Sequence, residues 1–259
     1  MNNFATFLSK EILEIWRKKR LVVLVGVFVF FALTMPLLER YSEEFINLFM
    51  TEEQAAAFEI EMPPPHWTGS YGAFYGMVNQ IGMIALILLV MGVVVSEKRR
   101  GTAALMMVKG LNHSTFILTK FVALSFMIFI ALLVSLTVNH FLTAVLFEQI
   151  AQTGDLIAGF AVYLLFAMMM LSMVILASTI AQSLALAAVA GFLGFMAMSL
   201  PSNLPNVRDW WPYAISFDAV HITVGLDAPD RMLVRMLMAA IITALFLFLS
   251  IFILRKKEL

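Results

Sequence analysis

Residues 156–207 read LIAGFAVYLLFAMMMLSMVILASTIAQSLALAAVAGFLGFMAMSLPSNLPNV, a run without one charged side chain. A helix that crosses a bilayer needs about 20 predominantly apolar residues, so this run is too long for one span. Gln182 and Ser183 interrupt it at a point where a short turn would divide it. We therefore predict two membrane-spanning helices here, over 156–181 and 184–200.

Four further uncharged runs, at 21–38, 67–96, 121–147 and 236–254, bring the predicted spans to six. The composition agrees, because 62% of the 259 residues are hydrophobic, 13% are charged and the mean hydropathy is +0.93. A water-soluble domain of this composition would expose a very large apolar surface. The sequence predicts an all-α polytopic membrane protein, with residues 1–259 forming one transmembrane domain.

The charged residues between the spans indicate the orientation of the chain. Loops that stay in the cytoplasm retain Lys and Arg, whereas exported loops do not. If the N-terminus is inside, the exported segments hold only Arg40, Arg208, Arg231 and Arg235 of the 17 basic residues, and most of the acidic residues lie there instead. We expect a multi-pass protein of the prokaryotic cytoplasmic membrane with both termini in the cytoplasm.

The segment before the first span, residues 1–20, is predicted to be an amphipathic elbow helix that lies along the cytoplasmic interface. Glu11 stands within its apolar stripe and interrupts it. Two interpretations stay open for this helix, a basic anchor that orients the first span and a docking surface for a cytoplasmic partner. The stripe has i, i+3, i+4 spacing and consists of Phe4, Phe7, Leu8, Ile12, Ile15 and Trp16.

Two exported regions have their own patterns. The loop 39–70 is acidic, and Thr51 begins a capping-box spacing that predicts a short helix, which Pro63, Pro64 and Pro65 would stop. The region 201–232 contains four prolines and the pair Trp210 and Trp211, and its apolar part is too short to cross. We predict a re-entrant segment there, before the sixth span, shielded by protein.

The cytoplasmic loop 97–120 reads EKRRGTAALMMVKGLNHSTFILTK. Gly101 and Thr102 can end the descending helix and cap a new short one, whose apolar surface includes Leu105. Ser114 is expected to cap the helix that returns to the membrane. A short helix held parallel to the membrane between two spans is a mechanical contact that would transmit the motion of a partner to both.

Several kinds of chemistry are missing from the sequence. There is no Gly-x-x-x-x-Gly-Lys-Ser/Thr loop, so we do not expect this chain to hydrolyse ATP, and no zinc-protease or nucleophile-elbow motif occurs. The predicted spans contain no Asp, Glu, Lys or Arg, which an ion-coupled carrier would ordinarily need. The polar residues at membrane depth either bond neighbouring helices or line a substrate path, and the candidates for a path are Asn79, Gln80, Asn139 and His140.

The whole chain resembles the membrane-spanning permease subunit of ATP-binding-cassette (ABC) transporters, in the type-two exporter class. The resemblance includes the elbow helix, the six spans, the long first external loop and the re-entrant region. Its most specific part is the coupling loop, in which the family pattern is matched by Glu97, Gly101, Thr102, Leu105 and Lys120. Gly110, His113 and Thr119 depart from that pattern.

The resemblance implies a half-transporter. Two permease chains would pair, as a homodimer in the simplest case, and each would dock on a separate ATPase subunit that binds ATP and Mg. This chain would itself bind no cofactor and carry no catalytic residue. The residues that would couple to the ATPase are Glu97, Gly101, Thr102, Leu105, Lys109 and Lys120. Two other function classes stay open, an ion-coupled secondary carrier and an ATPase-linked membrane anchor or sensor that transports nothing. Nucleic acid is not an expected partner.

Overall fold

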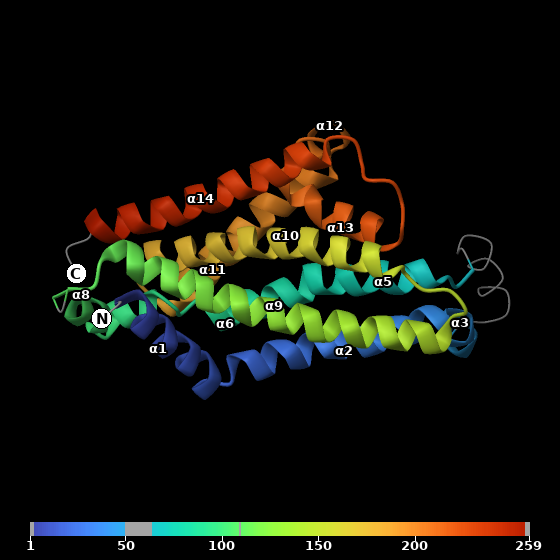
Figure 1. The fold of residues 1–259 in the computed structure, drawn as a ribbon, viewed down its shortest axis with the longest axis horizontal. Coiled ribbons are helices and arrows are strands. Elements are labelled where there is room, and N and C mark those ends of the chain that lie inside the picture. The colour runs from blue at the N-terminus through green and yellow to red at the C-terminus, as the bar shows by residue number, and fades with distance from the viewer. Residues whose placement is uncertain (1–2, 50–63, 109, 257–259) are drawn as a thin grey trace.

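The computed structural model describes residues 3–49, 64–108 and 110–256, and within these ranges the chain is helical and has no strands. Six helices are long and apolar enough to cross a membrane, as predicted. They form an elongated bundle (Figure 1). They are α2 (Arg20–Arg40), the segmented second span Trp67–Arg99, α9 (His113–Leu146), α10 (Thr153–Ile180), the span Leu184–Asn203, which includes α11 (Leu184–Ser199) and the 3-10 turn η2 (Leu200–Asn203), and α14 (Met232–Lys256).

The turn predicted between the fourth and fifth spans is confirmed. α10 ends at Ile180, and α11 begins at Leu184 after Ser183, whose side chain accepts a hydrogen bond from the amide of Leu186 (3.2 Å). Ser183 is therefore the N-cap of the fifth span, which explains why a polar pair suffices to divide so long an apolar run.

The second span is not one regular helix. It consists of α5 (Trp67–Met77), a π-helical turn η1 (Val78–Gly82), α6 (Met83–Val90), a turn over 91–94, and α7 (Val95–Arg99). Ser178 of α10 forms hydrogen bonds with the backbone at the turn over 91–94. Its hydroxyl accepts from the amides of Val94 (3.1 Å) and Val95 (3.2 Å) and donates to the carbonyl of Met91 (2.7 Å). The turn over 91–94 is thus held in place by α10.

α10 is the centre of the bundle. It packs against α9, α11 and α14 and against the short α13 (Ile215–Thr223), and 67% of its apolar window is buried, compared with 22% for the windows in the fifth and sixth spans. Two aromatic residues of α10 contact rings from other segments: the centroid of Tyr163 lies 4.8 Å from that of Tyr75, and the centroid of Phe166 lies 5.2 Å from that of Tyr213. The fifth and sixth spans therefore leave most of their apolar surface for lipid or for another chain.

Short helices occupy both ends of the bundle. α1 (Asn3–Arg17), α8 (Thr102–Val108) and the C-terminal end of α14 lie at one end, and α3 (Ser42–Phe49) lies at the other (Figure 1). The region 201–232 contains η2, α12 (Pro205–Arg208), η3 (Pro212–Ala214) and α13. The helix start predicted at Thr51 lies outside the described residues. The cap predicted at Ser114 is wrong, because α9 begins at His113 and follows Asn112.

Candidate functional site

A buried ion network joins α1, α7 and α9 at the end of the bundle that carries α8. Lys120 of α9 is 1% exposed, and its Nζ lies 2.9 Å from Oε1 of Glu11 in α1 and 3.1 Å from Oε2 of Glu97 in α7. The contact with Glu11 is a hydrogen bond, whereas the contact with Oε2 of Glu97 is an ion pair without hydrogen-bond geometry. The other oxygen of Glu97 accepts from Nζ of Lys10 (2.8 Å), which also bonds Glu11 (3.0 Å). We call Lys10, Glu11, Glu97 and Lys120 the coupling network.

The register of α1 explains why Glu11 is buried. Phe7, Glu11 and Ile15, spaced by four residues, form the face that packs on α9 and are each at most 9% exposed. The rings of Phe7 and Phe116 lie 5.9 Å apart, and Nζ of Lys120 lies 4.7 Å from the Phe116 ring centre. A cation above an aromatic face is stabilised further when water is excluded. Glu11 therefore does not disrupt the apolar stripe but supplies the counter-charge that Lys120 requires.

The charge states in this region follow from its contacts. Burial disfavours the charged form of Lys10, but the hydrogen bond to Glu97 and the charges of Glu11 and Glu97 outweigh burial and raise the pKa of Lys10 above its ordinary value. Burial also disfavours charge on Glu14, but its hydrogen bond with Lys18 (2.5 Å) and the neighbouring lysines lower the pKa of Glu14 to about 2. Both side chains are therefore ionised at neutral pH.

Three carboxylates, Glu11, Glu14 and Glu97, have oxygens within 4.8 Å of one another, a separation that a metal site could use. Lysine ammonium groups already neutralise these oxygens, however, since Lys10 approaches all three side chains within 3.5 Å and Lys120 approaches two of them. The cluster is accordingly an ion-pair network between helices.

A second set of contacts ties α7 to α10. Nζ of Lys98 donates to the carbonyls of Thr179 (2.6 Å) and Ala181 (3.2 Å), at the C-terminal end of α10. Helix C-termini carry unpaired carbonyls and a partial negative charge, so a lysine there is stabilising. With the Ser178 contacts described above, α7 is fixed to α10 on one side and, through Glu97, to α1 and α9 on the other.

α8 projects from this fixed base. Gly101 adopts φ +69° between α7 and α8, a left-handed conformation that favours glycine. The hydroxyl of Thr102 donates to the carbonyl of Glu97 (3.1 Å), so it links the two helices and does not cap α8 as predicted. Ala103 is buried, but Leu105 is 56% and Val108 86% exposed. α8 thus presents an apolar surface at the end of the bundle.

The predicted coupling residues are only partly gathered. Glu97, Thr102 and Lys120 are joined by the contacts above, Gly101 forms the turn, Leu105 is on the exposed surface, and Lys109 lies outside the described residues. Sequence reasoning missed the contacts of four other residues. The sequence around Lys98 and Ser178 gave no local signal of their contacts. The spacing of Glu11, four residues from both Phe7 and Ile15, could have indicated that Glu11 lies on the buried face. The four are Lys10, Glu11, Lys98 and Ser178.

The polar residues predicted at membrane depth do not form one site. Asn79 lies in the π-helical turn, where it accepts from the hydroxyl of Tyr213 (3.1 Å) and donates to Ser216 (3.4 Å). Gln80 is exposed, and His140 is hydrogen-bonded to Tyr71 (2.7 Å). Asn139 is fully buried, and its side-chain amide has no hydrogen-bond partner among the residues that the structure describes.

The other half of the bundle contains a polar cavity of about 730 Å³ beside α13 and α14. Arg235 and Asp218 form a bidentate pair in its wall (2.7 and 2.9 Å). A smaller cavity of about 210 Å³ reaches Asn79. The two cavities share the lining residues Arg208, Phe217 and His221. The two cavities are therefore neighbours, and the smaller one lies beside the irregular turn of the second span.

The fold and these contacts define a multi-pass helical protein with six candidate membrane spans and an ion network between helices beside a projecting short helix. Residues 5–214 match the family described as ABC-2 family transporter protein, and the chain belongs to this family. It is also similar to the uncharacterized transmembrane protein YxlG of Bacillus subtilis (strain 168), with 26% identity over 235 residues that cover 89% of this chain and 88% of that protein. The family is that of transporter membrane components.

Proposed function

We propose that this chain is the membrane-spanning subunit of an ABC exporter and that α8, together with α1, receives a separate cytoplasmic ATPase subunit. One observation carries the proposal: the exposed apolar side chains Leu105 and Val108 stand on a helix whose base is anchored to three other helices by Glu97 and Lys98. Force applied at α8 would therefore be passed to α1, α9 and α10. Family membership supports an ATPase partner.

In the complete transporter two copies of this chain would pair, each with its own ATPase, and ATP and Mg would bind to the ATPase subunits. The exposed apolar surfaces of the fifth and sixth spans are available for that pairing. The end that carries α8 would be cytoplasmic, with both termini, and the loop regions 39–70 and 201–232 would face outward. Closure of the ATPase pair would then switch the pathway between inward-facing and outward-facing states.

The two neighbouring cavities support a pathway that passes Asn79. π-helical turns inside α-helices are frequent at functional sites, and here one interrupts a span where a cavity reaches it. Asn79 and the shared lining residue Arg208 would contact a substrate in this pathway. Gln80, Asn139 and His140 lie apart from these contacts, and any part they have in the pathway would require another conformation or the second chain.

The test is purification of the tagged full chain from its native membrane in mild detergent, with identification of the co-eluting subunit and assay of its ATP hydrolysis. Leu105→Asp should reduce the co-eluting ATPase by about tenfold or more, because a charge would then be buried in the docking surface. Leu204→Asp is the matched control, since Leu204 is also 56% exposed but lies beyond the far end of the fifth span.

Reconstitution in vesicles separates the remaining functions. ATP-dependent export that the Leu105 variant loses would support the proposal, whereas ATPase association without transport of any substrate would favour a membrane anchor or sensor. Transport that proceeds at full rate without ATP and without the ATPase would identify an ion-coupled carrier and contradict the proposal.

A further inference from the structure

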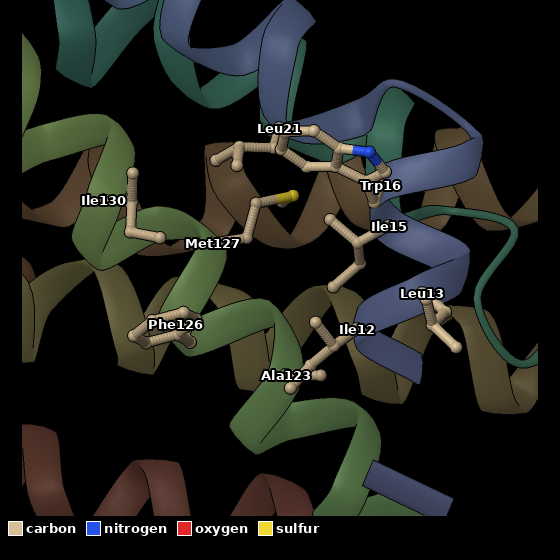
Figure 2. A pocket seen from close by; sticks show the side chains of 9 residues that line it. All are labelled: Ile12, Leu13, Ile15, Trp16, Leu21, Ala123, Phe126, Met127 and Ile130. Carbon is tan, nitrogen blue, oxygen red and sulfur yellow. The ribbon is translucent and has the colours of Figure 1, made fainter. Parts of the chain in front are cut away.

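An apolar cavity of about 280 Å³ lies where α1, α2 and α9 meet. Figure 2 shows side chains from all three helices around it, including Trp16, Leu21 and Ile130. Every lining residue is apolar. Trp16 is 66% exposed and Ile12 42%, although both belong to a helix that is otherwise docked on α9. The cavity is large enough for part of an acyl chain, and apart from the indole N–H of Trp16 its lining side chains offer no hydrogen bond to a polar ligand.

The chain between two of the lining residues, Trp16 and Leu21, is a run of four basic residues, 17–20. Lys19 has φ 54°, a left-handed conformation that turns the chain sharply from α1 into α2. Lys18 is paired with Glu14, but in the part of the chain that the structure describes Arg17, Lys19 and Arg20 have no ion pair. These three basic residues therefore adjoin lining residues of the cavity in the sequence, and Arg20 also interacts electrostatically with the charges of Glu14, Glu11 and Glu97.

The position of the cavity relative to the bilayer follows from the lengths of the spans. The uncharged run of α2 begins at Leu21, so the basic residues before it mark the level of the lipid headgroups. α9 has 34 residues and α2 has 21, which means that α9 extends beyond this level toward α8. The α9 residues that line the cavity, among them Ala123 and Ile130, therefore lie at the boundary between headgroups and acyl chains.

We propose that this cavity binds one anionic phospholipid, with an acyl chain against Trp16 and Ile130 and the phosphate group at Arg17, Lys19 and Arg20. Charge complementarity selects the occupant, because a zwitterionic lipid would bring its own cation to a site that already holds several. The lipid would touch α1 and α9 next to the coupling network, since Ala123 is three residues from Lys120 and Ile12 follows Glu11. This proposal does not depend on an ATPase partner.

The test uses the purified full chain in neutral detergent, titrated with phosphatidylglycerol or phosphatidylcholine and followed by native mass spectrometry. The first phosphatidylglycerol should bind at least about thirtyfold more tightly than the first phosphatidylcholine, as expected when two or three basic side chains contact an anionic headgroup. In the double variant Arg17→Gln, Lys19→Asn only Arg20 remains, and this preference should fall to about fivefold or less. Asparagine is chosen because it tolerates the left-handed conformation of residue 19.

The matched control is Arg99→Gln with Arg100→Gln, which removes two exposed basic side chains at the same end of the bundle and should keep the preference. Location is read from fluorescence, since phosphatidylglycerol with brominated acyl chains should quench an emission component that the Trp16→Phe variant lacks. Equal affinity for the two lipids, a preference that survives in the Arg17, Lys19 variant, or an unquenched Trp16 would overturn the proposal.

A measurement on the unmodified chain covers the case in which the double variant does not fold. Raising the salt concentration to about 0.5 M screens exposed charges at distances above a few ångströms and should reduce the preference for phosphatidylglycerol severalfold. A preference that is unchanged at this salt concentration would show that Arg17, Lys19 and Arg20 do not select the lipid, and it would overturn the proposal as firmly as equal binding would.

Discussion

Replacement of Lys120 by methionine tests whether the coupling network holds α1 to the bundle. Methionine is unbranched and one atom shorter than lysine, and the substitution leaves the carboxylates of Glu11 and Glu97 with Lys10 as their shared cation. Removing one partner of a buried ion pair costs about 3–5 kcal/mol, whereas an exposed pair contributes at most about 1 kcal/mol. Since Lys10 remains, we expect the lower end of the buried range, about 3 kcal/mol.

For a chain of this size, 1 kcal/mol corresponds to a change of about 2–4 °C in the melting temperature, so Lys120→Met should lower it by about 6–12 °C. The measurement is far-ultraviolet circular dichroism of the purified protein in detergent. Lys18→Met is the matched control, because its lysine is 42% exposed and paired with Glu14, and the expected loss is no more than about 4 °C.

A compensating variant separates loss of the ion pair from loss of packing. Glu11→Leu combined with Lys120→Met replaces two buried charges by apolar side chains, an exchange that is often neutral. At least half of the lost melting temperature should return. The reasoning is refuted if Lys120→Met is no more harmful than Lys18→Met, or if the double variant loses the sum of the two single effects, since residues in contact should not be additive.

Three further predictions concern the second span and the elbow helix. Ser178→Ala leaves two buried backbone amides without an acceptor and should lower the free energy of unfolding by about 2–4 kcal/mol. The measurement is hydrogen exchange at residues 94–95, which should become faster. The control Thr137→Ala removes an exposed hydroxyl and should change the exchange little. Gly101→Ala forces a side chain into a positive φ and should cost about 1–2 kcal/mol in thermal unfolding; Gly154→Ala, with open space and ordinary φ, should be neutral. The pKa of Glu14 is lowered to about 2, so its contribution to stability is present above pH 4.5 and is lost as the pH falls toward 2. Glu14→Gln should flatten the melting temperature over that pH range.

The spans could be predicted from the sequence because they depend on local properties. An uncharged run of sufficient length has few alternatives to a transmembrane helix, and a polar pair whose second residue is a serine N-cap ends one helix and begins another. The break at Gly101 is local for the same reason, since glycine accepts a positive φ that other residues resist.

The candidate site was harder to predict because its contacts join distant segments. Glu11 and Lys120 are 109 positions apart, and their pairing depends on which face of α1 docks on α9. Periodicity placed Phe7, Ile12 and Trp16 on one stripe, whereas the structure buries Phe7 and leaves Ile12 and Trp16 exposed. Asn79 likewise meets Tyr213 and Ser216 only through the packing of α13, for which the sequence offers no local signal.

The nature of the contacts at α7 bears on the proposed transmission of force. Apolar side chains can slide over one another at small cost, whereas a hydrogen-bonded lysine fixes direction as well as distance. Lys98 holds α7 to α10 in this directional way, and Lys10 holds it to α1 through Glu97, whereas Lys120 joins it to α9 by an ion pair. A displacement of α8 would move these helices as one body. The Glu11, Lys120 double variant therefore separates two roles: it should recover thermal stability, but if the network fixes register, ATP-driven transport should stay impaired. Full recovery of transport would show that packing alone transmits the motion.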